Sequence, residues 1–405
     1  MTKVCLGYGI GAVDLEIGPG CEVVLPNELP PAGPDEIDHA LASSINADLA
    51  GFEGCKSASI LVSDPTRPAP SYKMLPPLVK RLRAIGIDDI LVVFGLGTHR
   101  RMTKEEEQRL LGDCISLPHI QHDRSRCINL GSTSRGTPVE ILEDVALSDL
   151  IIGTGNIEYH YYAGYSGGAK AVLPGVSSER SITINHELMR DPLAASGHLD
   201  SPVREDMEDA AEVAGLDFIL NVVQNSKKEV VRAVAGDFID AHREGAEVVD
   251  AMYRRPVEPA EIVVACAGGR PKDVNLFQAH KALDNARDAA LPGGTIILVA
   301  ECSEGFGHPV FERWVREAES PEDCVKRFGR EYEFGGHKAA LIAKESLSHE
   351  LILVSSMPGE LAEMSFFKHA SSLDQAVAMA RVAQGQGARM IVMPYGNLTL
   401  ATRKT

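Results

Sequence analysis

Short apolar runs alternate with longer amphipathic stretches along most of the chain. The apolar runs have the length and residue types of buried strands, and they begin near Ser59, Ile90, Asp149, Glu261, Gly294, Leu351 and Arg389. Apolar residues spaced by three or four predict helices over residues 35–49, 74–85, 104–111, 203–214, 237–253 and 275–289. Strands and helices that alternate in this way predict an α/β fold.

The chain is long enough for two domains. Its 405 residues exceed one ordinary domain, so two separate cores are expected. Residues 254–259 form the expected linker, because their two prolines cannot continue the preceding helix. We therefore expect two α/β domains, an N-terminal one over residues 1–255 and a C-terminal one over 260–394. Residues 4–25 are interpreted as a hairpin, and residues 395–405 are a candidate for completing the first domain.

Composition and charge exclude several classes of function. The formal net charge is −17, which leaves no basic footprint for nucleic acid, and 44% of the residues are hydrophobic, which argues against disorder. Eight cysteines occur without a CxxC pair, as suits a reducing compartment. The chain starts directly with a strand-like segment, and no apolar run approaches the roughly 20 residues of a membrane span. We expect a cytoplasmic protein that binds neither membranes nor nucleic acid.

Two of the predicted strands end in turns that carry polar side chains. Asp64, Thr66 and Arg67 follow one strand, and a Gly-Thr-His turn with His99 follows another. Ligands of open α/β sheets bind at the carboxyl ends of strands. A lone arginine would be interpreted as a solvated surface charge, but a repeated pattern of this kind favours a site.

A glycine-rich segment follows a third strand. Residues 160–170 read His-Tyr-Tyr-Ala-Gly-Tyr-Ser-Gly-Gly-Ala-Lys, with His160 and Lys170 at the ends, and His186 lies farther on. Gly167 and Gly168 let the backbone adopt positive φ and come close to a bound group. A glycine-rich turn in isolation is more often only a turn. Together with the two other strand ends, it predicts a ligand site.

These three motifs, in this order, resemble the lactate racemase family. Its members share a DxTR loop, a GTH loop and an HxxAGxSGGxK segment that is followed by a nickel-binding histidine. Gln278 and Lys281 are similar to the family's substrate-binding Q-x-x-K, so the resemblance covers nearly the whole chain. It implies a racemase or epimerase of 2-hydroxy acids, an isomerase that uses a nickel-pincer nucleotide. That cofactor is a Ni(II)-pyridinium-3,5-bisthiocarboxylate mononucleotide, which holds nickel through sulfur and carbon.

The resemblance also implies a role for individual residues of the first domain. Lys170 would carry the cofactor through a thioamide bond, and His186 would ligate the nickel. His99 and His160 would be the acid/base pair. The loop of Asp64, Thr66 and Arg67 would hold the cofactor phosphate and help to orient substrate, with Gly167 and Gly168 also beside the cofactor.

The resemblance further implies what the chain binds. Gln278 and Lys281 of the second domain would bind the substrate carboxylate together with Arg67. The active site would then lie in the cleft between the domains, and closure of the cleft would exclude water. The partners would be a small 2-hydroxy acid and the proteins that synthesise the cofactor.

The chemistry supports this assignment independently of the family. Removal of the α-proton of a 2-hydroxy acid is slow because a carbanion beside a carboxylate is poorly stabilised, so a route through the 2-keto acid is easier. That route needs a hydride acceptor and one base on each face of the substrate. Histidine suits the exchange of the hydroxyl proton near neutral pH, and Arg or Lys suits the carboxylate. The cofactor supplies the hydride chemistry.

Other motifs fit less well. Residues 7–12 match a loose G-x-G-x-x-A, but a strand-like alternation follows where a dinucleotide site needs a helix, so a β-turn is the better interpretation. Residues 164–170 lack the spacing of a nucleoside-triphosphate loop. His186 has no second histidine at the zinc-protease spacing. His119 and His122 could chelate a metal, but a polar pair without a third ligand is more often solvated.

Two other classes of function stay open. One is an NAD-dependent 2-hydroxy acid dehydrogenase that uses glycine-rich loops at 266–270 and 304–307, although neither carries the full fingerprint. The other is a non-catalytic carrier of the nickel cofactor. A carrier protein would use Lys170 and His186, but a carrier function does not explain why both His99 and His160 are present.

The substrate is expected to be larger or more polar than lactate. The second domain contains only Trp314 as a candidate for an aromatic lid, and the region most similar to the lid reads Phe-Gly-Gly-His-Lys at 334–338. His337 and Lys338 would offer polar groups to the C3 side of the substrate, where a methyl group would need an apolar wall. We therefore expect a malate-like acid or a sugar acid.

Overall fold

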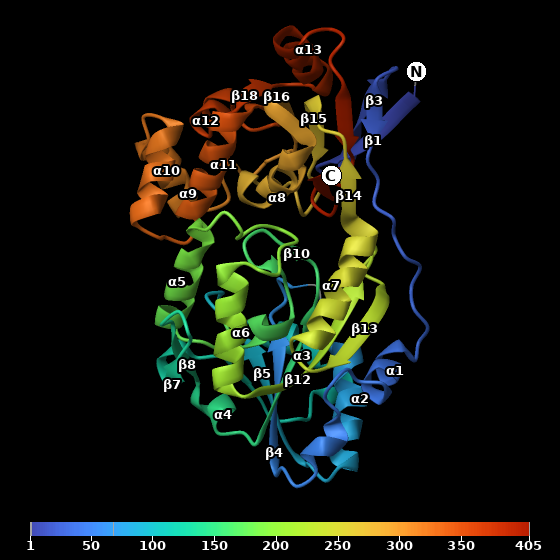
Figure 1. Ribbon diagram of the computed structural model, residues 1–405, viewed down its shortest axis with the longest axis vertical. Helices are drawn as coiled ribbons and strands as arrows, with labels where there is room; N and C mark the ends of the chain where they lie inside the picture. Colours follow the sequence, from blue (N-terminus) through green and yellow to red (C-terminus); the bar gives the residue numbers. More distant parts are fainter. Residues whose placement is uncertain (1, 68, 405) are drawn as a thin grey trace. The chain divides into compact units, whose positions relative to one another are not determined.

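The computed structural model describes residues 2–67 and 69–404, and the chain divides into two compact units (Figure 1). Unit 1 combines the first 27 residues with those from Tyr253 onward, and unit 2 is Glu28–Met252. Each unit has its own six-stranded sheet. The prediction of an α/β chain with two domains is confirmed.

The sheet of unit 2 has the order β13-β12-β9-β4-β5-β6. All neighbours pair in parallel except β13, which is antiparallel to β12. The strands are β4 (Ser57–Ser63), β5 (Asp89–Gly95), β6 (His119–Gln121), β9 (Leu150–Asn156), β12 (Leu216–Gln224) and β13 (Val230–Gly236). The central strands are buried along nearly their whole length, which explains their continuous apolar runs.

Helices and small hairpins complete unit 2. The helices are α1 (Glu36–Ala42), α2 (Ser71–Ala84), α3 (Lys104–Leu111), α4 (Glu143–Ala146), α5 (Glu179–Glu187), α6 (Pro202–Ala214) and α7 (Asp240–Tyr253). Two hairpins pair β7 (Cys127–Ser132) with β8 (Pro138–Leu142) and β10 (Tyr159–His160) with β11 (Gly164–Tyr165). Thr103 caps α3 in a capping box with Glu106, as its position before the helix predicts.

The first helix is shorter than the expected 35–49. It ends at Ala42, because Ile45 then bonds to the edge of β13, where its N–H donates to the carbonyl of Ala235 over 2.8 Å. Asn46 has φ 53, a left-handed conformation that cannot continue a helix. A tertiary contact therefore overrides the helical pattern.

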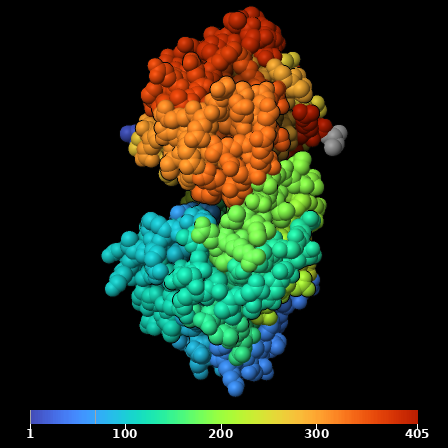
Figure 2. Space-filling model, turned by 90° about the vertical axis from the view of Figure 1, so that its left-hand side faces the viewer, coloured from blue at the N-terminus to red at the C-terminus, as the bar shows by residue number. Residues whose placement is uncertain are grey.

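Unit 1 contains a fully parallel sheet in the order β18-β17-β16-β15-β19-β3. Its strands are β3 (Cys21–Val23), β15 (Ala260–Cys266), β16 (Ala290–Val299), β17 (Glu350–Val354), β18 (Lys368–Ala370) and β19 (Met390–Met393). Its helices are α8 (Leu276–Ala286), α9 (Pro309–Glu317), α10 (Pro321–Arg330), α11 (Gly336–Ser348), α12 (Gly359–Met364) and α13 (Leu373–Gln384). Residues of α9 and α10, orange in Figure 2, form one surface of this unit.

The N-terminal hairpin belongs to unit 1. β1 (Thr2–Tyr8) and β2 (Gly11–Ile17) pair around a turn in which Gly9 has φ 57, so the β-turn interpretation of residues 7–12 is confirmed. Leu6 and Leu15 of the hairpin are buried in the same core as β15–β17. The first 27 residues therefore pack with the C-terminal part of the chain, which differs from the expected domain of residues 1–255.

The expected linker is also different. Residues 254–257 form β14 (Arg254–Val257), which pairs in parallel with β20 (Leu400–Arg403). Pro256 is compatible with this because a two-stranded ribbon has free edges. The end of the chain, within the expected 395–405 segment, thus stays in unit 1. Within the described residues, no helix has both the length and the apolar character needed to cross a bilayer.

Candidate active site

Three neighbouring strands bring the three sequence motifs to one edge of the unit 2 sheet. β9, β4 and β5 lie side by side and run parallel, so their carboxyl ends meet at the same edge. Asp64 follows β4, His99 follows β5, and the segment from His160 to Lys170 follows β9. This edge is where open α/β sheets bind ligands.

Asp64 holds the ring of His99. Its Oδ2 lies 2.9 Å from His99 Nδ1, and its Oδ1 accepts a 2.8 Å hydrogen bond from the N–H of Thr66. Burial alone would raise the pKa of the Asp64 carboxyl, but the bonds from His99 and Thr66 lower it to about 2. Because Nδ1 faces a carboxylate, Nε2 is the nitrogen left to exchange a proton with a ligand. The sequence did not indicate this pairing and assigned Asp64 to the cofactor phosphate instead.

Arg67 belongs to the same turn. Its N–H donates to the Asp64 carbonyl over 3.0 Å, and its guanidinium is partly exposed. The charge of Arg67 acts on Tyr162 and Lys170 of the glycine-rich segment. The first and third motifs therefore share one electrostatic environment.

The glycine segment is closely packed within unit 2. Gly167 and Gly168 have φ 74 and 59, and the Gly168 N–H donates to Asn221 Oδ1 over 2.8 Å. A Cβ on Gly168 would come within 2.8 Å of the ring of His242, which itself bonds to the carbonyl of Ser166 over 2.8 Å. Both conformation and space therefore require glycine here.

The side chain of Arg204, on α6, binds the backbone of the same segment. The residue is fully buried, and its guanidinium donates to the carbonyls of Ala163 and Tyr165 on either side of Gly164. Its Nη1 has no hydrogen-bond partner in the part of the chain that the structure describes. Burial lowers the pKa of Arg204 to about 10. A buried cationic group with an unsatisfied N–H favours an anion nearby.

Lys170, Tyr162 and His186 form the inner part of the site. Lys170 Nζ lies 5.0 Å from the centroid of the Tyr162 ring, and the Tyr162 hydroxyl lies 2.7 Å from His186 Nε2. Burial, followed by the charges of Arg204 and Arg67, lowers the pKa of Lys170 well below its ordinary value. Burial and the Lys170 charge lower the pKa of His186 to about 3. The His186 imidazole is therefore neutral at pH 7, as a metal-binding imidazole must be, and the lowered pKa of Lys170 favours the uncharged amine that a nucleophile needs.

His160 lies at the start of the segment among aromatic rings. Its ring stacks on Tyr161 at a centroid distance of 5.2 Å and meets the edge of Tyr162 at 4.3 Å. Tyr162 thus contacts both His160 and His186. The sequence did not single out Tyr162, Arg204, Asn221 or His242, because only their tertiary positions relate them to the motif.

Unit 1 carries Gln278 and Lys281 on α8. Asn275 caps this helix by accepting the Gln278 N–H over 3.0 Å, and residues three apart lie on one helix face. Gln278 is exposed and Lys281 is half-buried. Both side chains can therefore present polar groups from the same turn of the helix.

The structure buries His337 and Lys338. His337 is fully buried, Lys338 is 3% exposed, and Lys338 Nζ lies 3.0 Å from His280 Nδ1. Burial lowers the pKa of Lys338 to about 7. Trp314 is also buried, where it packs against Gly336. Lys338 and His280 therefore form a buried polar pair in unit 1.

The glycine loop at 266–270 is filled by the chain's own hairpin. A Cβ on Gly7 would lie 2.8 Å from the carbonyl carbon of Gly268, and Arg270 pairs with Glu301 over 2.9 Å. No room is left there for the close approach of a pyrophosphate, which disfavours the dehydrogenase interpretation. His122, expected to be solvated, is 4% exposed instead.

The described part of the chain offers no complete metal site by itself. Among the described residues, no three His, Cys, Asp or Glu side chains come together as metal ligands. His186 alone could supply one imidazole, so a metal at this place would have to be held mainly by an organic group. An anionic cofactor fits these surroundings, which offer the Lys170 amine with its lowered pKa, the close backbone of Gly167 and Gly168, and the unsatisfied N–H of Arg204. The Tyr162 hydroxyl would have to leave His186 Nε2.

Comparison with known proteins identifies the family. The model of the lactate racemase N-terminal domain matches residues 8–197, and that of the C-terminal domain matches residues 256–400. The chain belongs to the lactate racemase family. A lactate racemase of Thermoanaerobacterium thermosaccharolyticum is 32% identical over 91% of both chains, and one of Lactiplantibacillus plantarum is 32% identical over 89% of this chain and 88% of its own.

Solved structures agree with this membership of the lactate racemase family. The lactate racemase apoprotein of Thermoanaerobacterium thermosaccharolyticum superposes with a TM-score of 0.92 at 30% identity, over 99% of this chain and 100% of the other. A Thermotoga maritima protein of 19% identity and TM-score 0.66, over 92% of this chain and 99% of the other, shares the fold. The resemblance and the isomerase class that the sequence motifs indicate are confirmed.

Proposed function

We propose that this lactate racemase family member inverts C2 of a 2-hydroxy acid through the 2-keto acid, with a nickel-pincer nucleotide bound in unit 2. One observation carries the proposal. At one sheet edge, a histidine oriented by a buried carboxylate, His99 with Asp64, accompanies Lys170, whose pKa is lowered, and the neutral imidazole of His186. These are the groups that acid/base exchange, covalent attachment and metal ligation need.

The cofactor would be held by residues of the glycine segment and its neighbours. Lys170 would form the thioamide bond, His186 would ligate the nickel, and Gly167 and Gly168 would lie against the nucleotide. Arg67 and Thr66 would contact the phosphate. When bound, the cofactor supplies the acceptor for the hydrogen that leaves C2 with its electron pair.

The chain's own histidines would move the hydroxyl proton. His99, held at Nδ1 by Asp64, takes or returns the proton through Nε2 on one face of the substrate, and His160 does so on the other. Arg67, Gln278 and Lys281 would bind the carboxylate, which lets the flat keto acid be recaptured from either side. Two bases are needed because each turnover removes a proton on one face and returns it on the other.

The substrate is proposed to be larger or more polar than lactate, a malate-like or sugar acid. His337 and Lys338 were the sequence-based reason for this. We propose that the two side chains present polar groups to the C3 side of the substrate, with Lys338 Nζ lying 3.0 Å from His280 Nδ1. Polar groups that stay unpaired with a small apolar substrate would then disfavour lactate.

The test is purification from a host that makes the nickel cofactor, followed by absorbance spectroscopy, nickel analysis and incubation with a panel of D- and L-2-hydroxy acids. Chiral chromatography should show interconversion, fastest for malate or a sugar acid. NAD binding with no nickel in the purified protein would contradict the proposal. Lactate as the best substrate would contradict only the part that concerns substrate size.

A further inference from the structure

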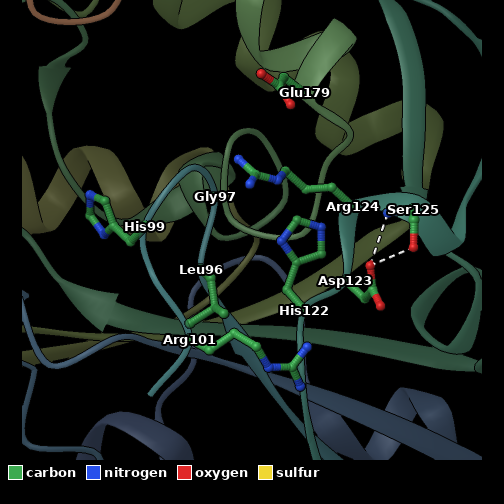
Figure 3. Close-up of a pocket in the computed structure, with 9 residues that line it drawn as sticks. All are labelled: Leu96, Gly97, His99, Arg101, His122, Asp123, Arg124, Ser125 and Glu179. Atoms are coloured by element: carbon green, nitrogen blue, oxygen red, sulfur yellow. Dashed lines mark hydrogen bonds between the residues drawn. The ribbon is translucent and has the colours of Figure 1, made fainter. Parts of the chain in front are cut away.

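A pocket of about 490 Å³ opens in unit 2 on the loop that follows β5. Figure 3 shows its walls: the turn at Leu96 and Gly97, the side chains of Arg101, His122 and Arg124, and Glu179 at the start of α5. His99 lies on its border. None of the three polar side chains Arg101, His122 and Arg124 has a role in the proposed reaction.

Four arginines occur close together here, and they differ in whether the guanidinium forms an ion pair. Arg100 forms a two-pronged ion pair with Glu106 at 2.7 and 2.8 Å, and Arg126 pairs with Asp144 over 2.9 Å. Both of these carboxylates lie outside the pocket lining.

Arg101 and Arg124 differ from these neighbours. Neither guanidinium has an ion-pair partner in residues 2–67 and 69–404, and both line the pocket. In Figure 3 the Arg124 guanidinium extends across the pocket towards Gly97. Both guanidinium groups thus line the pocket without an ion pair, although the charge of Arg101 also acts on the nearby Asp123 carboxyl.

His122 adds a third donor or acceptor. It is 4% exposed, its ring points into the pocket, and its Nδ1 has no hydrogen-bond partner among the described residues. Burial lowers its pKa to about 4, so the ring is neutral at pH 7 and can either donate or accept one hydrogen bond. A buried polar atom without a partner is unfavourable, so a ligand that bonds to it is favoured.

Two acidic residues also line the pocket, and among the described residues neither forms an ion pair with Arg101 or Arg124. Asp123 Oδ1 accepts bonds from the Ser125 N–H and hydroxyl at 3.0 and 2.7 Å, and these bonds, followed by the charge of Arg101, lower the pKa of the Asp123 carboxyl. Glu179 is exposed, at the edge of the pocket. The groups that remain for a ligand inside the pocket are therefore Arg101, Arg124 and His122.

We infer that this pocket binds a small oxyanion, a carboxylate or a phosphate, through Arg101, Arg124 and His122. The paired N–H groups of a guanidinium bind both carboxylates and phosphates through two parallel, charge-assisted hydrogen bonds. The oxyanion would come either from a second acidic group of the substrate or from the cofactor phosphate. In the second case, the loop of Thr66 and Arg67 would orient substrate and would not hold the phosphate. The binding itself does not depend on the proposed reaction, so the two can fail separately.

The binding is tested on the cofactor-free chain by titration calorimetry at low salt, with inorganic phosphate and with malate as probes. At least one probe should bind, and Arg101→Gln and Arg124→Gln should each weaken it by about 10- to 100-fold. Arg126→Gln, which removes an equal charge from the same turn but from a paired residue, should leave the affinity within about twofold. Absence of binding by the wild type, or equal loss in the Arg126 variant, would overturn the inference.

The source of the oxyanion is decided on protein from a host that makes the cofactor. If the cofactor phosphate occupies the pocket, Arg124→Gln should lower nickel content and the mass adduct while Arg126→Gln keeps both. If the substrate supplies the oxyanion, loading should stay normal, and KM should rise at least tenfold for malate but not for lactate. Either result supports the site. Normal loading with unchanged KM for both acids, despite weakened probe binding, would show that neither source uses it and would contradict the inference.

Discussion

Within the site, the ionisation of the Asp64 carboxyl has the clearest effect on the free energy of unfolding. Its pKa is about 2 in the folded chain against an ordinary value of 3.8, so the ionised form stabilises the fold at neutral pH by about 2 kcal/mol. This contribution is present above about pH 4 and is lost as the pH falls towards 2. Urea unfolding of Asp64→Asn should show about that loss at pH 7 and a flatter acid limb. Asp88→Asn, on the exposed surface, is the control.

The paired histidines give a second prediction at the residue scale. His99→Ala and His160→Ala should each lower turnover by roughly 10²- to 10⁴-fold in both directions, because general acid/base groups contribute about that much. Circular dichroism and nickel content should stay normal. Near-normal turnover in either variant would make that histidine structural.

Lys170 gives a third prediction, which needs no activity. Intact mass of protein made with the cofactor should show an adduct that disappears in Lys170→Ala and also in Lys170→Arg, because a guanidinium does not form the amide-type bond. His186→Ala should keep the organic adduct but lose nickel. An adduct that persists without Lys170 would contradict the assigned attachment point.

At the scale of elements, the glycine segment shows what packing adds to a motif. Gly168→Ala should lower the free energy of unfolding by about 1–2 kcal/mol for the left-handed backbone alone, and by more because its Cβ meets His242. Gly215→Ala is the matched control, since Gly215 has φ 76 with no atom near its Cβ. Urea unfolding measures both variants. Equal losses of unfolding free energy would mean that the His242 side chain moves away from the added Cβ without cost.

The elements also show how far the sequence could be interpreted. Strands β4, β5 and β9 and their terminal motifs could be predicted, because buried parallel strands are continuous apolar runs and their ends carry the chemistry. The residues that hold the site in place from other elements could not be predicted. Arg204 and His242 lie on helices far along the chain, and nothing local distinguishes them from surface or core residues. The burial of His337 and Lys338 could not be predicted either, because polarity alone does not distinguish a side chain on a pocket wall from one of a buried pair.

At the scale of the whole molecule, the division into units predicts which parts of the chain fold alone. Residues 28–252 should unfold cooperatively as a separate protein. Residues 253–405 should not, because Leu6 and Leu15 of the missing hairpin fill their core, at about 1.5–3 kcal/mol for each buried side chain. A permutant that joins residues 1–27 after residue 405 through a flexible linker should restore folding, as measured by amide exchange. A stable 253–405 fragment would contradict this.

The edge strand β3 pairs with β19, so residues 21–23 must wait for residues 390–393 before they can join the sheet. During synthesis, unit 2 can complete its own sheet while β3 still has no strand to pair with. Synthesis of β19, rather than completion of the unit 2 sheet, therefore sets the moment at which the sheet of unit 1 can be completed.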